Sequence, residues 1–238
     1  MKIALIGYGK MGKAIERIAV AKGHEVILKI DLDNGFEMTP ENLRRADVAI
    51  EFTGPSSAAD NLLICAQAGV RTISGSTGWL DKLDDVKSAF VKSGSAFLYA
   101  SNFSIGVNIF FELNKKLAAL MAPHPEYAVE MLEIHHTQKK DAPSGTAITL
   151  AEQVMHENPS LKHWVNRPAH SPGELPILSK REDPAPGTHE VRYYSSVDDI
   201  EIIHTAHNRE GFAGGAVLAA EYIRDKKGIF SMKDVLGF

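Results

Sequence analysis

The stretch KIALIGYGKMG, residues 2–12, decides the fold, because an aliphatic run leads into a G-x-G-x-x-G motif and then into a helical pattern. Gly7 permits a tight turn, Gly9 lets the backbone approach a pyrophosphate, and Gly12 allows close packing of helix on strand. The amides and the dipole at the helix start favour phosphate charge. Asp31, nineteen positions past Gly12, ends a second predicted strand, where a carboxylate suits a ribose 2′-hydroxyl. The stretch therefore predicts a dinucleotide site.

Around this stretch, the N-terminal part of the chain alternates short aliphatic runs with helical patterns, as βαβ units and a parallel sheet do. The predicted strands are apolar throughout rather than alternating, which is typical of a sheet covered on both faces. Strands are predicted at residues 2–6, 25–30, 47–52, 70–73 and 96–99, and helices at 12–22, 56–67 and 80–93.

After Ser101 the pattern changes to longer helices and to strands of a mixed sheet. Residues 158–188 are rich in proline, glycine and charge, so we expect a surface loop region whose length suggests a lid or contacts between subunits. Helices are predicted at 107–121, 144–156 and 211–224, and strands at 128–135, 190–194 and 199–205. The predicted fold is α/β: an N-terminal Rossmann-type parallel-sheet domain for the dinucleotide (1–103 and 209–238), and a second α+β mixed-sheet domain for substrate binding and oligomerisation (104–208).

Composition excludes several classes of protein. Hydrophobic residues make up 44% and charged residues 24% of the chain, which is ordinary for a globular protein and unlike a disordered or fibrous one. The net charge of −4 gives no basic field for nucleic acid, and no apolar run reaches the ~18 residues of a membrane span. Residues 1–7 are interpreted as a first strand rather than a signal peptide. The single cysteine, Cys65, cannot form an internal disulfide, which fits a buried thiol in a cytoplasmic protein.

Three further loops follow predicted strands, at the edge where ligands of open α/β sheets collect. Their small residues let the backbone approach a cofactor, although ordinary turn chemistry is the alternative. In the glycine loop, Lys10 and Met11 are expected to contact the cofactor as well. The three loops are Phe52-Thr53-Gly54-Pro55, Gly75-Ser76-Thr77-Gly78 and Ala100-Ser101-Asn102-Phe103.

The choice between NADH and NADPH depends on Asp31. A carboxylate there favours NADH, because it repels the 2′-phosphate of NADPH. No arginine follows Asp31. Lys10, Lys13 and Lys29 lie close enough in the sequence pattern to supply compensating charge, so use of both cofactors stays open.

The densest chemistry lies in the run EIHHTQKKDAPSGT, residues 133–146. Two histidines and two lysines precede a helix start, where the amides of Gly145 and Thr146 form an anion site. Lys139 or Lys140 adds positive charge for a carboxylate. The run predicts a carboxylate substrate and a histidine that donates a proton. Adjacent histidines rarely bind one metal ion together, so no metal is expected.

At this run the sequence resembles the dihydrodipicolinate reductase (4-hydroxy-tetrahydrodipicolinate reductase) family of bacterial lysine and diaminopimelate synthesis. The resemblance covers essentially the whole chain. Its most specific part is the string His-His-x-x-Lys-x-Asp-Ala-Pro-Ser-Gly-Thr, residues 135–146. The N-terminal glycine motif belongs to it too, as do GSTG at 75–78, NFSIGVN at 102–108 and IEIIHTAHNR at 200–209.

The resemblance implies that NADH or NADPH delivers a hydride to a cyclic dicarboxylate, 4-hydroxy-tetrahydrodipicolinate, which loses water and becomes tetrahydrodipicolinate. It implies that His135 donates the proton and that Lys139, rather than Lys140, is the catalytic lysine. It also implies a homotetramer. The positions that resemble the family's substrate site are His136, Lys139, Ser144, Gly145 and Thr146. Those that resemble its dinucleotide site are Gly7, Gly12, Asp31, Gly75, Thr77, Ala100 and Phe103, with Arg209 and Phe212 in a late segment that returns to the cofactor domain.

Three differences from the family pattern stand out. The glycine loop is one residue tighter than the commoner form, and Lys10 stands where an arginine is usual. The chain is short for the family, so we expect trimmed loops around the tetramer contacts. Asp183 occupies a position where a glycine is usual.

Two other functions are compatible with parts of the sequence. A different Rossmann oxidoreductase, such as an aspartate dehydrogenase, shares the nucleotide half but needs no dicarboxylate clamp beside paired histidines. A protein that senses NAD(P)H or serves as a scaffold without turnover needs no cluster of acid–base groups.

Overall fold

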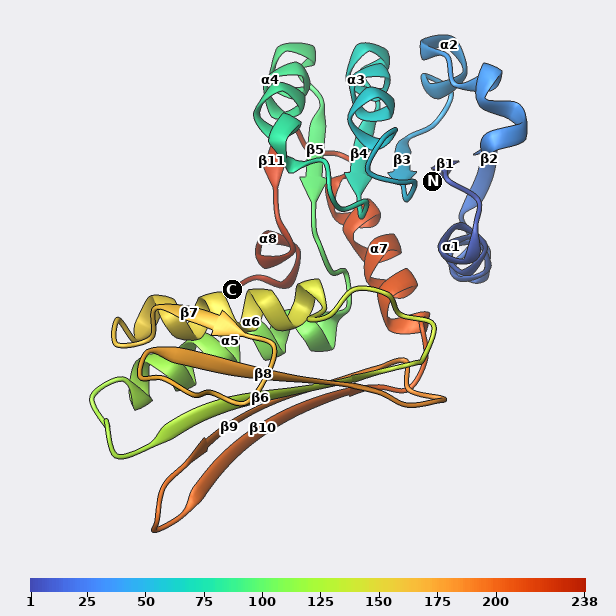
Figure 1. Ribbon diagram of the computed structural model, residues 1–238. Coiled ribbons are helices and arrows are strands. Elements are labelled where there is room, and N and C mark those ends of the chain that lie inside the picture. The colour runs from blue at the N-terminus through green and yellow to red at the C-terminus, as the bar shows by residue number, and fades with distance from the viewer. The chain divides into compact units, whose positions relative to one another are not determined.

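A parallel sheet of six strands organises the first of two units, Met1–Ile105 with Arg209–Phe238, in a computed structural model that describes residues 1–238 (Figure 1). Its strand order is β11-β5-β4-β3-β1-β2, and neighbouring strands are parallel. The predicted Rossmann-type sheet is confirmed. Its strands are β1 (Lys2–Ile6), β2 (Glu25–Ile30), β3 (Val48–Glu51), β4 (Arg71–Ser74), β5 (Ala96–Tyr99) and β11 (Gly228–Phe230).

Helices cover both faces of this sheet. One apolar cluster joins α1 (Lys10–Ala21), α7 (Glu210–Ile223) and α8 (Met232–Leu236) to the sheet, through residues such as Ile15 and Val217. The other joins α2 (Pro40–Leu43), α3 (Ala58–Ala68) and α4 (Leu83–Ser93), through residues such as Leu62 and Phe90. Every residue of β3 is buried; the apolar pattern predicts this for Val48–Ile50 but not for Glu51.

Helix α7 approaches the segment at Phe103 so closely that the contact requires a glycine. A Cβ atom on Gly215 would lie 1.8 Å from the carbonyl oxygen of Phe103. A Cβ atom on the neighbouring Gly214 would meet nothing within 4 Å. The two adjacent glycines of one helix therefore differ only in what they pack against.

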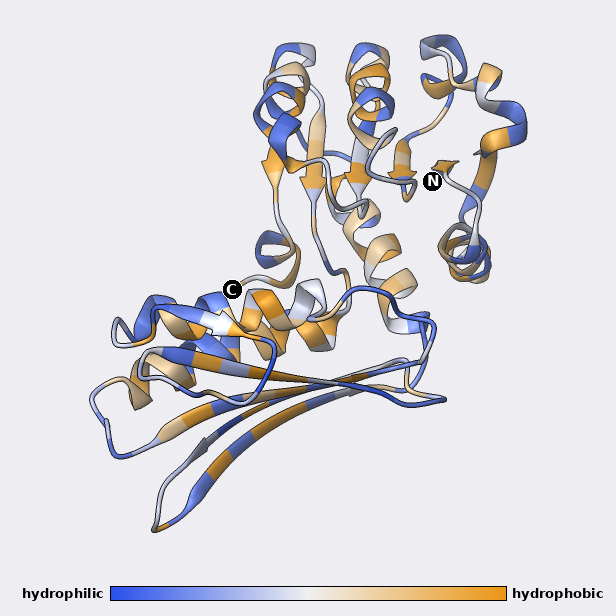
Figure 2. Cartoon of the chain, viewed as in Figure 1, coloured by the Kyte–Doolittle hydropathy of each residue, from blue (hydrophilic) through white to orange (hydrophobic).

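The second unit, Gly106–Asn208, contains a mixed sheet of five strands in the order β10-β9-β6-β8-β7. Strand β6 pairs in parallel with β8 and antiparallel with β9, which pairs antiparallel with β10. Helices α5 (Ile105–Met121) and α6 (Gly145–Glu157) pack on one face of this sheet. Figure 2 shows hydrophilic and hydrophobic residues alternating along β10. The strands are β6 (Ala128–His135), β7 (His163–Val165), β8 (Glu174–Arg181), β9 (Gly187–Tyr194) and β10 (Asp199–Ala206).

The surface-loop interpretation of residues 158–188 is wrong for β7, for β8 and for residues 187–188 at the start of β9. Residues 163–165 form β7, and 174–181 form β8, which lies between β6 and β7 inside the sheet. Leu175 and Ile177 of β8 are fully buried. Pro176 lies between them, and the strand still pairs with β7 at this position. Because proline is common in loops, its presence in the apolar run led to the prediction of a loop. Four short elements of the first unit also escape sequence prediction: the 3-10 helix η1 (Leu32–Glu37), α2, β11 and α8.

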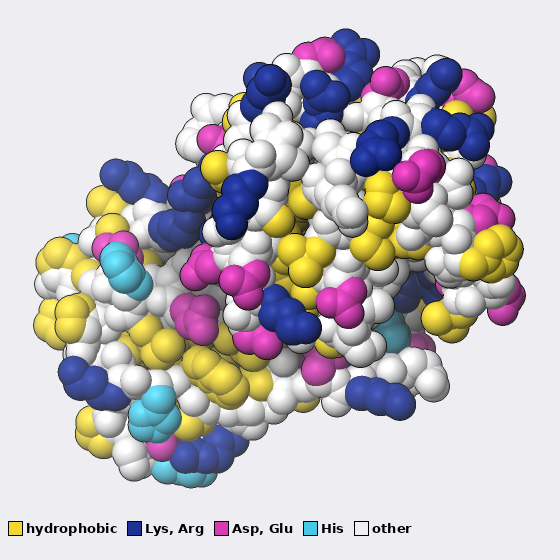
Figure 3. Space-filling model, turned by 90° about the horizontal axis from the view of Figure 1, so that it is seen from above, with side chains coloured by type: hydrophobic (Ala, Val, Ile, Leu, Met, Phe, Trp, Pro, Cys, Tyr) yellow, Lys and Arg dark blue, Asp and Glu magenta, His cyan; other side chains and the backbone are white.

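The surface carries both signs of charge. On the face shown in Figure 3, Lys and Arg side chains are interspersed with Asp and Glu, in keeping with the net charge of −4. The structure has no helix with the length and apolar character needed to cross a bilayer.

Candidate active site

The glycine loop between β1 and α1 adopts the tight turn that the sequence predicts. Gly7 has φ +92°, and a Cβ atom there would lie 2.0 Å from the carbonyl oxygen of Phe52. A Cβ atom on Gly12 would lie 2.3 Å from the carbonyl oxygen of Gly7. Gly9 is the N-cap residue of α1, so the amides of the first helical turn begin where a phosphate is expected.

Two open cavities lie along the ends of the first unit's strands and collect most of the predicted cofactor residues. The larger, about 670 Å³, contains Gly7, Gly9, Asp31, Phe52 and Thr53. The smaller, about 420 Å³, is lined by Gly9, Lys10, Met11, Gly12, Phe52, Thr53, Gly75, Ser76 and Thr77, together with Gly54 and Pro55. The predicted residues Ala100, Asn102, Phe103, Arg209 and Phe212 line neither cavity.

Sequence reasoning missed one wall of the larger cavity, which includes Leu32, Gly35 and Met38 around η1. Asp31 caps this short helix: its carboxylate accepts a hydrogen bond of 3.0 Å from the Leu32 amide. The Asn34 side chain accepts one of 2.7 Å from the Asp31 amide. An Asp followed three positions later by Asn is the signal that would have predicted this capped turn.

The charge of Lys29 is already neutralised. Its ammonium lies 2.6 Å from the Glu16 carboxylate and 5.1 Å from the centroid of the Tyr8 ring. Glu16 also accepts a hydrogen bond from the Tyr8 hydroxyl. The sequence pattern offered three lysines as partners for a 2′-phosphate. One of them, Lys29, is therefore already paired within the protein.

A buried carboxylate that sequence reasoning missed joins two of the cofactor loops. Glu51, at the end of β3, has no exposed surface. It accepts hydrogen bonds of 2.9 Å from the Thr53 amide, 2.6 Å from the Ser74 hydroxyl and 2.7 Å from the Ser76 hydroxyl. The loops after β3 and β4 are thus held by one side chain.

The predicted proton donor and anion site lie on one continuous segment of the second unit. His135 ends β6, the loop 136–144 follows, and α6 begins at Gly145. Ser144 is the N-cap residue of α6, and its hydroxyl accepts a hydrogen bond of 3.2 Å from the Ala147 amide. The positive end of the helix dipole lies at this start and favours an anion there.

Lys139 and Lys140 differ in their surroundings. The Lys139 ammonium lies 2.8 and 2.9 Å from the two carboxylate oxygens of Asp141 and is half-buried, whereas Lys140 is exposed. Burial raises the pKa of Asp141, but the Lys139 contact outweighs it and the pKa lies below its usual value. Lys139 is thus held inside the segment, and His136 beside it is half-buried.

A buried network surrounds His135, and sequence reasoning gave its other members no role. His135 is 8% exposed, and its Nδ1 lies 3.2 Å from Oε2 of Glu133. The edge of its ring faces the ring of His189, with 5.1 Å between centroids. His189 Nε2 lies 3.1 Å from the Ser144 hydroxyl.

The pKa values in this network diverge. Burial raises the pKa of Glu133, but contacts from His135, Ser144 and Ser179 outweigh it and leave the pKa well below the usual range. Burial, together with the nearby His135, lowers the pKa of His189 to about 3, so His189 is neutral at physiological pH.

The sequence could have predicted part of this network, because the period of two along a strand places Glu133 and His135 on one face of β6. His189 comes opposite Glu133 only through the register of β9.

Glu133, His135 and His189 each place one possible metal ligand within 4.8 Å of the others. Glu133 Oε2 already accepts a hydrogen bond of 3.0 Å from the Ser144 amide, and its other oxygen lies 3.1 Å from the Arg181 guanidinium. The nearby positive charge disfavours a cation here. That no metal takes part stays a prediction.

Comparison with known proteins identifies the same family for both units. The family model described as "Dihydrodipicolinate reductase, N-terminus" matches residues 1–103, and "Dihydrodipicolinate reductase, C-terminus" matches residues 106–236. The 4-hydroxy-tetrahydrodipicolinate reductase of Christiangramia forsetii is 52% identical over 99% of this chain and 98% of its own. That of Methanosarcina barkeri is 36% identical over 97% of this chain and 83% of its own.

A solved structure shares the fold of the whole chain. It is described as dipicolinate-bound dihydrodipicolinate reductase from Paenisporosarcina sp. TG-14. It superposes with a TM-score of 0.76 at 24% identity, and the alignment covers 97% of each chain.

Proposed function

Because this chain belongs to the dihydrodipicolinate reductase family and reduces 4-hydroxy-tetrahydrodipicolinate to tetrahydrodipicolinate in lysine and diaminopimelate biosynthesis, we propose that His135 donates the proton and Lys139 orients the substrate. Family membership sets aside an aspartate dehydrogenase and a non-catalytic NAD(P)H-binding protein. The observation that carries the proposal is the single segment 135–146, in which a buried histidine, a half-buried lysine and a helix start follow one another.

We propose that Ser144, Gly145 and Thr146 at the start of α6 bind one carboxylate of the substrate, and that His136 and Lys139 contact it as well. Helix amides and an ammonium are the groups that bind carboxylates tightly. Lys139 now pairs with Asp141, so a substrate carboxylate would join or replace that ion pair. The dipicolinate bound to the Paenisporosarcina enzyme is a cyclic dicarboxylate and supports this class of ligand.

Pyridine-2,6-dicarboxylate tests this site, because it should compete with substrate for the same positive groups. Lys139→Ala should raise its inhibition constant roughly 10- to 100-fold, the equivalent of one charge-assisted hydrogen bond. Lys140→Ala is the matched control, since it removes a neighbouring charge from an exposed position. Inhibition constants from steady-state NADH oxidation give the comparison. Equal inhibition constants for the two variants would show that Lys139 is not part of the carboxylate-binding site.

The enzymes of this family use NADH or NADPH, and the N-terminal domain binds the nucleotide. We propose that the first unit, Met1–Ile105 with Arg209–Phe238, is that domain, and that residues 106–208 bind substrate and form the oligomer. The residues expected to contact the cofactor are those of the two cavities, with Ala100, Asn102, Phe103, Arg209 and Phe212 added from the resemblance.

We expect a preference for NADH. Asp31 lies in the larger cavity and the charge of Lys29 is already paired with Glu16, so a 2′-phosphate would meet the Asp31 carboxylate without compensation from Lys29. Two like charges about 4 Å apart repel by ~1 kcal/mol or more, which corresponds to a preference of at least roughly fivefold. Asp31→Asn should reduce that ratio while keeping an acceptor for the Leu32 amide that caps η1. The ratio of kcat/KM for NADH and NADPH measures it, and a wild-type preference for NADPH would contradict it.

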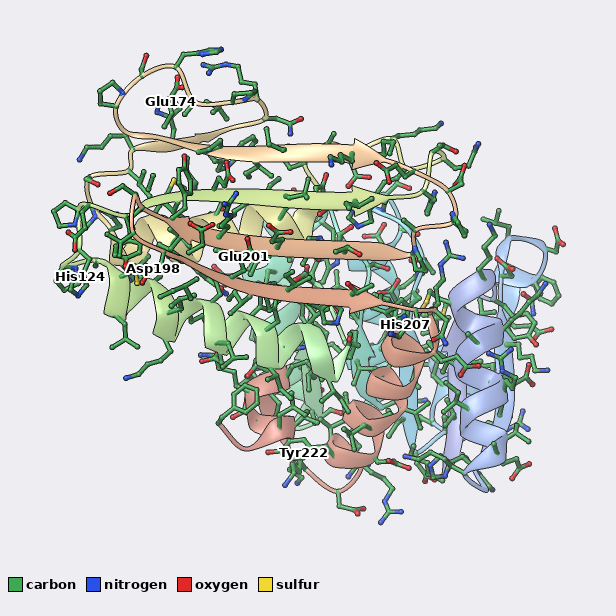
Figure 4. All side chains as sticks on the ribbon, turned by 90° about the horizontal axis from the view of Figure 1, so that it is seen from below. His124, Glu174, Asp198, Glu201, His207 and Tyr222 are labelled. Carbon is green, nitrogen blue, oxygen red and sulfur yellow. The ribbon has the colours of Figure 1, made fainter.

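We propose that the second unit forms a homotetramer through the face of its sheet that α5 and α6 leave open. Figure 4 looks onto this face, where Glu201 is labelled. Arg192 pairs there with Glu130, Asp199 and Glu201, and Ile203 is 54% exposed in the same strand as Glu201. The cores of subunit interfaces are more apolar than the rest of a protein surface, and interfaces are enriched in arginine. Light scattering of the purified chain gives the mass, and a monomer would contradict the proposal.

We also place this enzyme in the cytoplasm. Its single cysteine, Cys65, is buried, and burial raises the pKa of the thiol to about 12, so the thiol stays protonated and structural. Cell fractionation checks the location.

A further inference from the structure

We propose that Glu133 is the positioning residue of the active site: one buried carboxylate holds both the proton donor His135 and the substrate-binding helix start at Ser144. This inference rests on the proposed roles of His135 and Ser144. It concerns a fully buried residue that acts through its two neighbours.

The geometry places Glu133 at the junction of both parts. It precedes His135 by two positions on β6, so the two side chains share one face of the strand. Oε2 lies 3.2 Å from His135 Nδ1 and accepts a hydrogen bond of 3.0 Å from the Ser144 amide. His135 Nδ1 is buried and forms no hydrogen bond, so the 3.2 Å ion-pair contact with Glu133 Oε2 is the polar contact that the structure gives this atom. The orientation of the imidazole therefore depends on this carboxylate.

The other oxygen of Glu133 anchors the carboxylate itself. Oε1 accepts a hydrogen bond of 2.7 Å from the Ser179 hydroxyl and lies 3.1 Å from the Arg181 guanidinium. Arg181 also donates a hydrogen bond of 2.7 Å to the carbonyl oxygen of Asp141, in the loop that carries Lys139. A fully buried carboxylate is costly unless it is paired in this way. The partners from β8 keep Glu133 ionised and fixed.

An ionised carboxylate beside Nδ1 has a chemical consequence for His135. It favours a proton on Nδ1 and stabilises the imidazolium, so the proton that leaves is the one on Nε2. After the transfer, His135 is left neutral with its Nδ1 proton facing Glu133. The carboxylate thus selects both the atom that donates and the form that remains.

Several other titratable and charged groups lie around His135 and Glu133. His189 of β9 lies edge-on to the ring and is neutral at physiological pH, because its pKa is about 3. Arg181 of β8 reaches Glu133, and the loop after β6 carries the pair Lys139–Asp141. Substitution at Glu133 changes the one charge in contact with Nδ1 and leaves these groups in place.

Glutamine cannot replace Glu133, because the site presents hydrogen-bond donors to both oxygens. Ser144 N–H and His135 face one oxygen, while the Ser179 hydroxyl and Arg181 face the other. The amide of Gln has one acceptor oxygen, so its NH₂ must oppose donors on one side. The size of the side chain stays the same, which separates loss of charge from loss of packing.

The experiment measures kcat and KM against pH for Glu133→Gln in the full-length protein. We expect kcat to fall on the order of 100-fold. We also expect kcat to begin its fall at alkaline pH (its alkaline limb) at a lower pH than in the wild type. The direction of this shift follows from the loss of negative charge. An imidazolium without its carboxylate partner loses its proton at a lower pH, so activity that needs the protonated donor is lost at a lower pH.

Glu174→Gln is the matched control. Glu174 is a nearly buried carboxylate paired with Arg167 at the opposite end of β8 and touches neither His135 nor Ser144. It should keep the wild-type limb and kcat even where thermal stability falls. A purely structural role for Glu133 would lower stability without moving the limb, and that result overturns the proposal.

Two further variants keep the result decisive. If Glu133→Gln does not fold, Glu133→Asp keeps the charge but retracts it by one methylene, so kcat should fall several-fold with the limb near the wild-type position. A shifted limb with wild-type kcat in Glu133→Asp would overturn the proposal. His135→Gln separates this inference from the proton-donor assignment, because wild-type turnover in that variant rejects the donor whatever Glu133 does.

Discussion

We expect His135→Gln to lower kcat by roughly 10²- to 10⁴-fold, the usual contribution of a general acid, while the dissociation constant for NADH should stay near its wild-type value. Glutamine retains a polar group of similar reach but cannot deliver a proton. His135 lies in the second unit, whereas the glycine loop and its cavities lie in the first, so nucleotide binding should not change. Single-turnover NADH oxidation measures the step, and fluorescence titration measures NADH binding.

His156→Gln is the control for this substitution. His156 lies at the end of α6, and its side chain is 83% exposed beside Glu157, so its replacement should leave turnover unchanged. Retention of full turnover by His135→Gln would show that another group supplies the proton. Equal losses in both variants would point to damage to the fold.

Gly215→Ala should lower the free energy of unfolding by about 3 kcal/mol, at the upper end of overpacking effects, because the added methyl would lie 1.8 Å from the Phe103 carbonyl oxygen. The helix cannot yield without displacing the strand connection at Phe103. For a chain of this size the loss corresponds to a Tm lower by roughly 6 to 12 °C. Thermal unfolding followed by circular dichroism measures it.

Gly214→Ala is the matched control for that prediction. Its methyl meets nothing within 4 Å, and alanine is a better helix former than glycine by up to ~1 kcal/mol, so stability should rise or stay the same. If both variants lost stability equally, the close approach of α7 to Phe103 would not be the cause.

The sequence predicted most of the first unit because each βα repeat carries its own pattern. The run 2–12 contains strand, turn and helix in one local signal, and the structure reproduces all three. The short elements were missed because η1 and α8 each depend on a capping pair rather than on periodicity. Strand β8 was missed because Pro176 interrupts an apolar run whose burial depends on β6 and β7.

In the candidate active site, too, the sequence predicted what lies in one local string and missed what depends on contacts between strands. His135, Lys139 and Ser144 belong to one contiguous string, so the sequence could propose them together. Glu133, which contacts His135 and Ser144, is itself held by Ser179 and Arg181 from β8, and His189 from β9 contacts Ser144. Their positions depend on strand register, which no local pattern in a single sequence specifies.

The first unit is completed only by residues after Asn208, and this order has a consequence for protein synthesis. Helix α7 supplies Val217 and Ile223 to the cluster that covers one face of the parallel sheet, and β11 adds its edge strand beside β5. While the ribosome makes the second unit, the nascent N-terminal segment therefore exposes apolar side chains such as Ile3 and Val48. We expect chaperones to bind such a segment until residues 209–238 emerge.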